Sequence, residues 1–492
     1  MKKIKLLFVL SLFTLVCAQL SAKGDSYTYN FWDDIEKAPD AYRVSHVVYA
    51  ADLKLDKALK NPSSLFAVGN KIYVADTDNN RFLELEYTDK KTLELKRVID
   101  RVNPSPLLNG VETFNMPKDI FVSSEDGSFY FADSENGRVI KTDADLNVLT
   151  IFKEPEDSTY EKGKAFLPAK VVADSKGRVY LLSKNVNKGF LKYESDGSFQ
   201  GYYGATKVIV NVVERFWKKF ATEAQKARMT SFVPTEYSNC YIDKYGFIYA
   251  VTQTFSEWDL LSGDAAPIRR LNALGNDFLV QNGYNYAVGD LKWGDAGGIK
   301  GPSRMSDITV LDDEIYVALD ENRGRLFAYD NQGYLLFAFG GRGNVNGSFR
   351  KAASIEHIGK DLFVLDSVNA SITVFTPTEY GNLIYQATEQ YSVGEYDASA
   401  ETWAKVLEHN GNYDLAYIGL GKSFLRQNRY KEAMEYFKLK RDRRDYSKAF
   451  KYYRKEWIEK HIGWITGILI AAIVIWLVRR TVKRIKWEIS TL

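Results

Sequence analysis

Ile72-Tyr73-Val74-Ala75-Asp76 is a short apolar segment that ends in an aspartate, and Arg81 follows five residues later. Phe129-Tyr130-Phe131-Ala132-Asp133 repeats this pattern, and Arg138 follows at the same spacing. A short strand unit of this kind does not bury its apolar face alone, so its copies have to pack side by side. The repeat therefore predicts a closed array of small sheets, and it does not by itself define a function.

Weaker copies of the pattern continue to about residue 376, and six units can be counted. The third and fourth units keep the apolar strand but have Ser183 and Thr252 where the aspartate stood. The fifth unit restores both polar positions as Asp320 and Arg325, and the sixth retains Asp366. Short alternating strands separated by glycine or aspartate turns are typical of an all-β array.

These units resemble the NHL repeat, in which each copy forms a four-stranded blade around a central axis. The resemblance implies a six-bladed NHL-like β-propeller over residues 42–376, with a helical insertion near 205–233. Residues 42–49 are strand-like and precede the first unit. We expect them to supply the outer strand of the sixth blade, because the ring would otherwise leave an open sheet edge.

The repeated aspartates and arginines are interpreted as structural. An aspartate after a strand caps the following turn by accepting backbone N–H bonds. An arginine five residues later can pair with that aspartate or with the neighbouring blade. The structural repeat positions are Asp76, Arg81, Asp133, Arg138, Asp320, Arg325 and Asp366.

The N-terminal residues have the pattern of a secretory leader. The first five residues carry three lysines, residues 6–16 are apolar, and Ala18 or Ala22 offers a small residue for cleavage. The sequence predicts a signal peptide over residues 1–22, and an uncleaved anchor is the alternative. Lipidation of Cys17 is disfavoured because a bulky valine precedes it.

Residues 462–478 contain no charged side chain. At about 1.5 Å per residue such a helix spans roughly 25 Å, close to the thickness of a membrane core. We predict a juxtamembrane and transmembrane helix over 457–478 and a basic cytoplasmic tail over 479–492, with a buried core helix as the alternative. The chain is then a single-pass cell-membrane protein with residues 23–460 outside the cytoplasm. Basic residues also precede the helix, so the orientation depends chiefly on the leader.

Charge and cysteine content exclude a nucleic-acid-binding protein and a disulfide-stabilised fold. The leader carries three lysines and the tail four net positive charges, so the part between them has a net charge of −4 and lacks a nucleic-acid-binding footprint. Cys240 is the one cysteine outside the leader, so no internal disulfide forms. Its strand-like surroundings favour a small buried apolar residue rather than a reactive thiol.

Residues 378–456 have a helical pattern with an internal repeat. Gly394, Tyr396 and Trp403 recur thirty-four residues later as Asn428, Tyr430 and Phe437. This period resembles tetratricopeptide (TPR) repeats, in which a left-handed turn residue and a small residue let paired helices approach closely. Ala400 and Ala433 provide the small residues. The resemblance implies a peptide-binding groove, and a rigid stalk is the alternative.

The longest insertions, near residues 205–233, 254–266 and 274–301, are expected to converge on one face of the ring. Aromatic side chains beside carboxylates on long loops suit ligand capture, for example stacking on sugar faces. Alternatively, the aromatics pack the insertions onto the ring. The candidate ligand-binding residues are Trp217, Trp258, Asp259, Tyr284, Tyr286, Trp293 and Asp295, with Asp290 among them.

No catalytic residue is assigned from the sequence. Only two of the four histidines, His46 and His357, fall in the propeller, which excludes a His-rich zinc site, and no Gly-x-Ser-x-Gly nucleophile motif occurs. Gluconolactonase-like propellers hold a divalent metal in the axial channel with Glu, Asn and Asp, but those positions are not matched here. An all-oxygen divalent-cation site in the channel therefore stays open.

The sequence favours a non-enzymatic, membrane-anchored extracytoplasmic binding or scaffold protein without a cofactor. Its expected partner is a membrane or cell-surface protein or an extracellular carbohydrate. The alternative is a membrane-tethered, metal-dependent lactonase- or lyase-like enzyme. The axial channel distinguishes the two, because convergent acidic or amide side chains favour the enzyme and an aliphatic plug favours the binding module.

Overall fold

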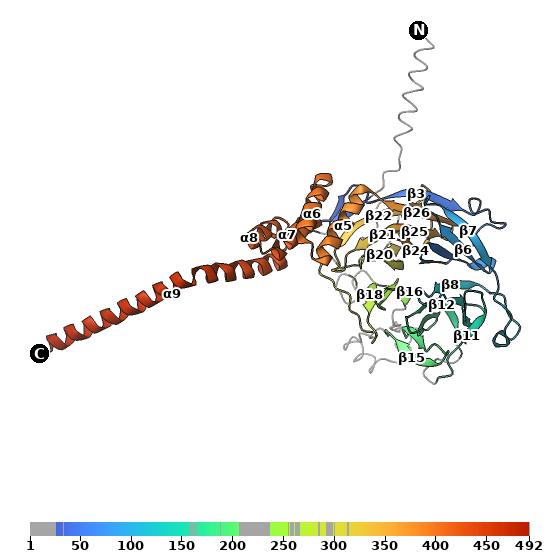
Figure 1. The fold of residues 1–492 in the computed structure, drawn as a ribbon, viewed down its shortest axis with the longest axis horizontal. Helices are drawn as coiled ribbons and strands as arrows, with labels where there is room; N and C mark the ends of the chain where they lie inside the picture. Colours follow the sequence, from blue (N-terminus) through green and yellow to red (C-terminus); the bar gives the residue numbers. More distant parts are fainter. Residues whose placement is uncertain are drawn as a thin grey trace, which may run out of the picture. The chain divides into compact units, whose positions relative to one another are not determined.

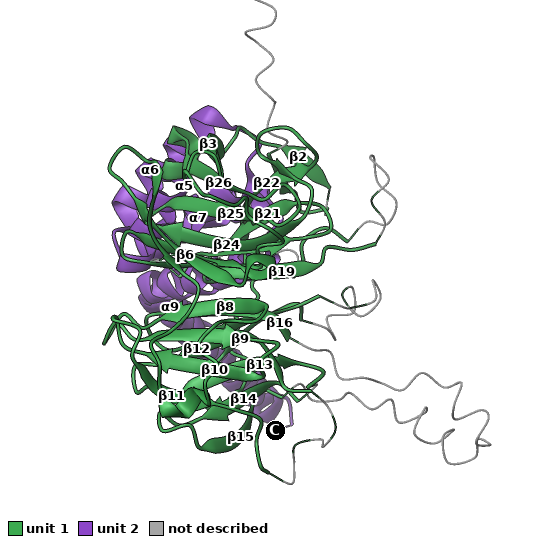
Figure 2. Cartoon of the chain, turned by 90° about the vertical axis from the view of Figure 1, so that its right-hand side faces the viewer, with its two compact units in different colours: residues 1–382 green, residues 383–492 purple. Residues whose placement is uncertain are grey.

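A computed structural model of the chain divides into two compact units, residues 1–382 and 383–492 (Figure 2). Six predicted site residues lie outside the described part of the chain, as do the predicted leader and most of the insertion near 205–233. The described residues are 26–32, 34–157, 160, 163, 165–186, 188–205, 237–253, 255, 260, 266–283, 286–291, 299, 301–311 and 314–491.

The first three sheets of unit 1 are four-stranded and antiparallel, and in each of them the strands follow one another in sequence order (Figure 1). The first sheet contains β4 (Ser64–Val68), β5 (Lys71–Asp76), β6 (Arg81–Tyr87) and β7 (Leu93–Ile99). The second contains β8 (Pro117–Val122), β9 (Phe129–Asp133), β10 (Arg138–Thr142) and β11 (Val148–Phe152). The third contains β12 (Leu167–Ala173), β13 (Val179–Lys184), β14 (Phe190–Tyr193) and β15 (Phe199–Tyr203).

Three further sheets complete unit 1. The fourth has three described strands, β16 (Tyr237–Ile242), β17 (Ile248–Thr252) and β18 (Ile268–Leu271). The fifth is built on β19 (Met305–Val310), β20 (Tyr316–Asp320), β21 (Arg325–Tyr329) and β22 (Leu335–Arg342), with β23 (Ser348–Phe349) beside β22. The sixth contains β24 (Ala352–Ile358), β25 (Asp361–Asp366), β26 (Ser371–Pro377) and β3 (Tyr42–Tyr49).

The first strands of the six sheets form a closed ring. Each contacts the first strand of the next sheet, from β4 through β8, β12, β16, β19 and β24 back to β4. These strands therefore line a common axis. The fold is a mainly β propeller of five to six blades, according to whether the three-stranded sheet is counted.

The strand that closes the ring comes from the N-terminal side, as expected. β3 pairs antiparallel with β26, with Val48 opposite Ile372 and His46 opposite Val374. Val48 is buried in the same apolar cluster as Ile372 and Val374. The last sheet thus holds strands from both ends of the propeller sequence, so its hydrogen bonds join the two ends of the ring.

A second N-terminal segment was not anticipated. The hairpin of β1 (Tyr27–Tyr29) and β2 (Ile35–Lys37) extends the fifth sheet, where Tyr27 pairs with Ala338 on β22. The propeller therefore uses residues that precede 42, the predicted boundary. Short strands with polar residues cover the edge of β22, which limits its pairing with other chains.

Apolar side chains fill the space between neighbouring sheets. Phe82 of the first sheet and Phe131 of the second are both fully buried, and their ring centroids lie 5.0 Å apart. Phe114, from the segment between the sheets, packs edge-on against Phe82 at 5.0 Å. Burying an aromatic side chain of this size contributes about 1.5–3 kcal/mol. Rows of such contacts join the blades.

The repeated aspartates hold the turns after the second strands. The Asp76 carboxylate accepts hydrogen bonds from the Asn79 amide and from Nε of Arg81, both at 2.8 Å. Asp133 has the same geometry, with Nε of Arg138 at 2.8 Å. These arginines lie under the surface and also donate to backbone carbonyl groups. Each Asp–Arg pair thereby ties its turn to the segment that precedes the sheet.

The later copies keep the aspartate and change its partners. Asp320 accepts the backbone N–H of Arg304 at 3.0 Å and the hydroxyl of Ser303 at 2.6 Å. Arg325 instead donates to the carbonyl of Gly340, within its own sheet. The Asp366 carboxylate accepts hydrogen bonds from four backbone N–H groups, those of Arg350, Lys351, Val368 and Asn369.

The second unit is helical. Its helices are α5 (Glu379–Val393), which begins in unit 1, and α6 (Tyr396–His409), α7 (Asp414–Arg426), α8 (Tyr430–Leu439) and α9 (Arg443–Ser490). Gly394 and Asn428 both have positive φ, at +91° and +63°, and each lies between two helices. Gly419 lies against the Trp403 ring, where a Cβ atom would collide, so α6 and α7 require glycine for their close contact.

The last helix is continuous for 48 residues, and no boundary occurs at the predicted position 457 (Figure 1). It contains an 18-residue window of mean hydropathy 2.2, none of which is buried in the protein. An exposed helix of this length and composition can cross a membrane. Length and composition alone are weak evidence of a membrane anchor.

Candidate functional site

A ring of polar side chains surrounds the propeller axis. In five of the six sheets the pairing of the first strand shifts near its start, as in a β-bulge. A bulge redirects the side chain that follows it. The residue after each shift is polar, and Ser64 begins the equivalent strand of the first sheet. The polar ring consists of Ser64, Asp119, Lys170, Asn239, Asp307 and Ser354, all of them buried.

Members of the polar ring bind the backbone of the neighbouring sheet. Asp119 accepts the N–H of Val171 at 2.9 Å, and Asp307 accepts the N–H of Ile355 at the same distance. Ser354 also accepts a backbone hydrogen bond from the first sheet, at 3.0 Å. Buried polar groups have to be hydrogen-bonded to be tolerated. The ring therefore satisfies first-strand N–H groups and fixes the blades around the axis.

Lys170 forms the one ion pair within the polar ring. Its Nζ lies 3.0 Å from Oδ1 of Asp119 and 3.5 Å from Oγ of Ser64, and Ser64 donates to the same carboxylate oxygen at 2.5 Å. Burial by itself lowers the pKa of Lys170, but the charges of Asp119 and Asp307 outweigh it and raise that pKa above its usual value. The axis therefore holds a permanent ammonium group.

Another carboxyl group lies next to the ring. Glu356 follows Ser354 by two residues on β24, so the two residues lie on the same face of the strand, with Glu356 one step further along the axis. It is fully buried beside Asp307, and burial followed by that neighbouring charge raises its pKa well above the usual value. Thr309 donates to Oε2 of Glu356 at 3.4 Å. Both effects disfavour the ionised form of Glu356.

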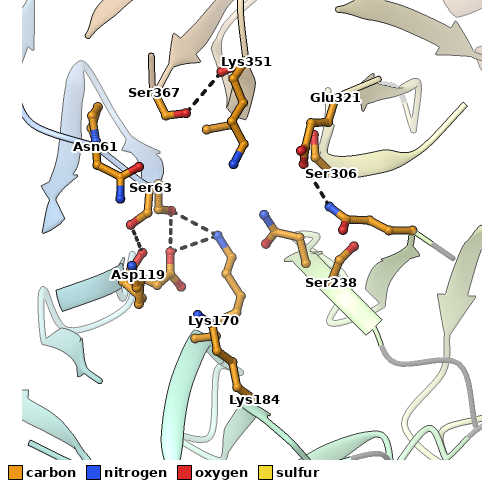
Figure 3. Close-up of a pocket in the computed structure, with 17 residues that line it drawn as sticks. Asn61, Ser63, Asp119, Lys170, Lys184, Ser238, Ser306, Glu321, Lys351 and Ser367 are labelled. Atoms are coloured by element: carbon orange, nitrogen blue, oxygen red, sulfur yellow. Dashed lines mark hydrogen bonds and ion pairs between the residues drawn. The ribbon is translucent and has the colours of Figure 1, made fainter. Parts of the chain in front are cut away.

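A cavity of about 350 Å³ opens above the polar ring (Figure 3). Figure 3 shows the ends of Lys351 and Lys170 reaching toward its middle from opposite sides. Burial lowers the pKa of Lys118, and the nearby charge of Lys184 lowers it further. The cavity is lined by Asn61, Pro62, Ser63, Ser64, Lys118, Asp119, Ala169, Lys170, Lys184, Ser238, Asn239, Gln253, Ser306, Glu321, Lys351, Ala353 and Ser367.

Most of the candidate site predicted from the sequence lies outside the described residues. Tyr286 is described and half exposed, and it does not line the axial cavity. The candidates outside the described residues are Trp217, Trp258, Asp259, Tyr284, Trp293 and Asp295. The predicted convergence of the three insertions on one face therefore stays a prediction.

Asp290, expected among the ligand-binding loops, has partners within the protein. The hydroxyl groups of Tyr27 and Tyr29 both donate to its carboxylate, and Arg323 lies 3.6 Å away. Burial, followed by the charge of Asp290 for Tyr27 and by that of Tyr27 for Tyr29, raises the pKa of both tyrosines far above the usual value. Asp290 therefore fastens the N-terminal hairpin to the fifth sheet.

The sequence carried a signal for the polar ring that the repeat comparison did not use. In five of the six first strands, a polar residue near the start of the strand directly precedes an apolar residue, as in Asp119-Ile120, Lys170-Val171 and Asp307-Ile308. A buried strand with one polar residue at a constant position indicates a shared structural or binding role for that position.

The donor set of the axis does not fit a divalent cation. Among the described residues, no group of three or more His, Cys, Asp or Glu is placed to hold a metal ion. Asp119, Asn239 and Asp307 are oxygen donors of the right kind. However, the Lys170 ammonium lies among them and already pairs with Asp119. A dication there would face a like charge that is buried with it.

The propeller is similar to solved lyase and lactonase propellers, at low sequence identity. It matches a streptogramin B lyase at 12% identity and a TM-score of 0.35, covering 73% of this chain and 88% of that one. Virginiamycin B lyase from Staphylococcus aureus matches at 10% and 0.38, with coverages of 68% and 99%. A protein described as a putative gluconolactonase matches at 11% and 0.39, with 72% and 98%.

No family model matches this chain, and no curated protein matches it. The similarity to solved structures concerns the β-propeller fold, and at these scores it carries no argument about activity. Function therefore has to be inferred from the axial site itself.

Replacing Lys170 by methionine tests the axial ion pair. The variant leaves the buried Asp119 carboxylate without its cation, and removing one partner of such a pair costs about 3–5 kcal/mol of unfolding free energy. Thermal unfolding of the full chain in detergent should show a clearly lower melting temperature for Lys170→Met. Lys176→Met, in an exposed turn of the same sheet, is the matched control. Equal melting temperatures for the two variants would contradict the role given to the pair.

Glu356→Gln tests the neutral carboxyl group. Because the pKa of Glu356 is raised, the folded protein keeps a proton that the unfolded chain releases above about pH 4.3, so stability falls as pH rises from that value. Glutamine does not titrate. The melting temperature of Glu356→Gln relative to wild type should therefore increase between pH 5 and 8. Exposed Glu125→Gln is the control, and parallel profiles for wild type and Glu356→Gln would disprove the assignment.

Proposed function

We propose that this chain is a membrane-anchored, extracytoplasmic binding protein whose propeller presents its axial cavity to a ligand. The observation that carries the proposal is the buried Lys170–Asp119 pair, which places an ammonium group among the oxygen donors of the axis. Polar side chains from all six sheets converge there without forming a metal site or an aliphatic plug. A fixed, polar, open-ended cavity of this kind suits recognition.

We take the ring as a six-bladed NHL-like propeller, since six first strands contact one another in a closed cycle. The helices that follow are taken as TPR-like, supported by the positive φ values of Gly394 and Asn428 and by the buried Ala400 and Ala433. This block either binds a peptide or serves as a stalk.

The membrane assignment rests on the two ends. The leader-like residues 1–22 direct the chain out of the cytoplasm, and the apolar part of α9 then holds it in the membrane, with the basic residues 479–492 inside. The propeller accordingly faces the extracytoplasmic space. The partners that fit this location are a membrane or cell-surface protein and an extracellular carbohydrate.

Cysteine labelling tests the location. In a Cys17→Ser background, Cys240 is buried and gives little reaction with a membrane-impermeant maleimide. On intact cells that express the full chain, Lys90→Cys in an exposed propeller turn should be labelled. Lys486→Cys in the tail should react only after the cells are permeabilised. The opposite pattern would show that the propeller is cytoplasmic.

Metal analysis separates the binding protein from the alternative enzyme. Full chain purified in detergent and dialysed should retain no stoichiometric Ca²⁺ or Mg²⁺, because Lys170 supplies the axial cation. With added Ca²⁺ or Mg²⁺, a simple lactone should be hydrolysed no faster in the presence of the protein than in buffer that contains the same ion alone. One retained dication per chain, together with turnover that EDTA abolishes, would establish a metal-dependent enzyme instead.

A further inference from the structure

The mouth of the axial cavity holds three lysines. Lys118, Lys184 and Lys351 each line the cavity from a different sheet region, and none of them forms an ion pair with any residue that the structure describes. Lys118 is close enough to Lys184 and Lys351 for both charges to disfavour its protonated form. Like charges gathered at one opening raise the local concentration of anions.

The carboxylates of the cavity are committed elsewhere. Asp119 already receives Lys170, Ser64 and the N–H of Val171. Glu321 accepts the Gln253 amide at 3.4 Å, on the other side of the opening. Asp78 and Glu135 also act on Lys118, but no carboxylate of the described residues forms an ion pair with any of the three lysines. An external anion is therefore the fitting partner.

The rest of the lining is small and polar. Serines and amides contribute most of the other side chains. Among the described lining residues there is no aromatic ring, and Pro62, Ala169 and Ala353 are the apolar ones. Asn239 uses its Oδ1 to accept the N–H of Cys240, so its amide N–H groups are its remaining donors. Such a surface suits a hydrophilic ligand with hydroxyl groups rather than stacking on a sugar face.

We propose that the axial cavity binds a small hydroxylated anion that carries a carboxylate or a phosphate group. Lys118, Lys184 and Lys351 hold the oxyanion at the mouth, and the serine and amide groups beneath contact the hydroxyls. The cavity volume of about 350 Å³ is at the small end of ligand pockets, which fits a single sugar-sized molecule rather than a polymer strand. This inference rests on the proposed binding function and names its ligand class.

Calorimetric titration of the full chain in a zwitterionic detergent tests the proposal with three matched probes. D-glucose, D-glucuronate and glucose 6-phosphate share a ring and differ in charge. Both anions should bind more tightly than glucose, and the stronger of the two identifies carboxylate or phosphate as the preferred group. Binding should weaken between 50 and 500 mM NaCl, because salt screens exposed charges.

Lysine variants locate the site. Lys351→Met should weaken binding of the preferred anion by about 10- to 100-fold, the usual effect of losing a hydrogen bond to a charged group. Lys184→Met should act in the same direction. Lys90→Met, which removes an exposed lysine outside the cavity, should leave the affinity unchanged. All three positions are at the surface, so melting temperatures near that of wild type verify the fold.

The remaining outcomes overturn the inference. Equal binding of glucose and the two anions would reject the anionic ligand while leaving a binding role for the cavity. Anion binding that Lys351→Met and Lys184→Met do not weaken would place the site elsewhere. Absence of binding by all three probes would reject a small hydroxylated anion as the ligand class, and the labelling experiment would still decide whether the propeller is extracytoplasmic.

Discussion

The closed ring of sheets depends on burying polar groups at its centre. Six first strands meet around one axis, and their backbone N–H groups need acceptors there. Asp119, Asp307 and Ser354 supply acceptors to the next sheet in the ring. The buried carboxylates in turn need positive charge or donors, and Lys170 provides the ammonium for Asp119. Packing between the sheets and the polar contacts at the axis therefore stabilise the same arrangement of the six sheets.

The same constraint shapes the chemistry of the cavity. A buried ion pair is weak evidence of stability, but breaking one is costly because the remaining charge is left unpaired. Lys170 is consequently held in place by its ion pair, whereas Lys118, Lys184 and Lys351 form no ion pair with any described residue. The buried pair disfavours a dication on the axis, whereas the lysines at the mouth are the basis of the proposed anion site.

Turn chemistry was the part of the fold that local sequence predicted best. Asp76 with Arg81 and Asp133 with Arg138 make the same bonds because each set lies within one turn. Where neighbours change, the same aspartate acquires other partners, as Asp320 does with Ser303. The closing strand 42–49 could also be predicted, since an open sheet edge requires a partner. The hairpin of β1 and β2 was missed because its strands are only three residues long.

The sequence by itself determined the sheet modules, their turns, the helical region and the apolar part of α9. Each of these follows from the periodicity and turn residues of a short stretch. The tertiary structure alone decided the axial site, because its members are far apart in the chain. Lys170 and Asp119 are 51 residues apart, and Ser354 and its partner Leu65 are 289 apart. Outside the axis, the same holds for Tyr27 and Asp290, which are 263 residues apart. Only ring closure brings such residues within hydrogen-bond distance, and a local pattern carries no information on that encounter.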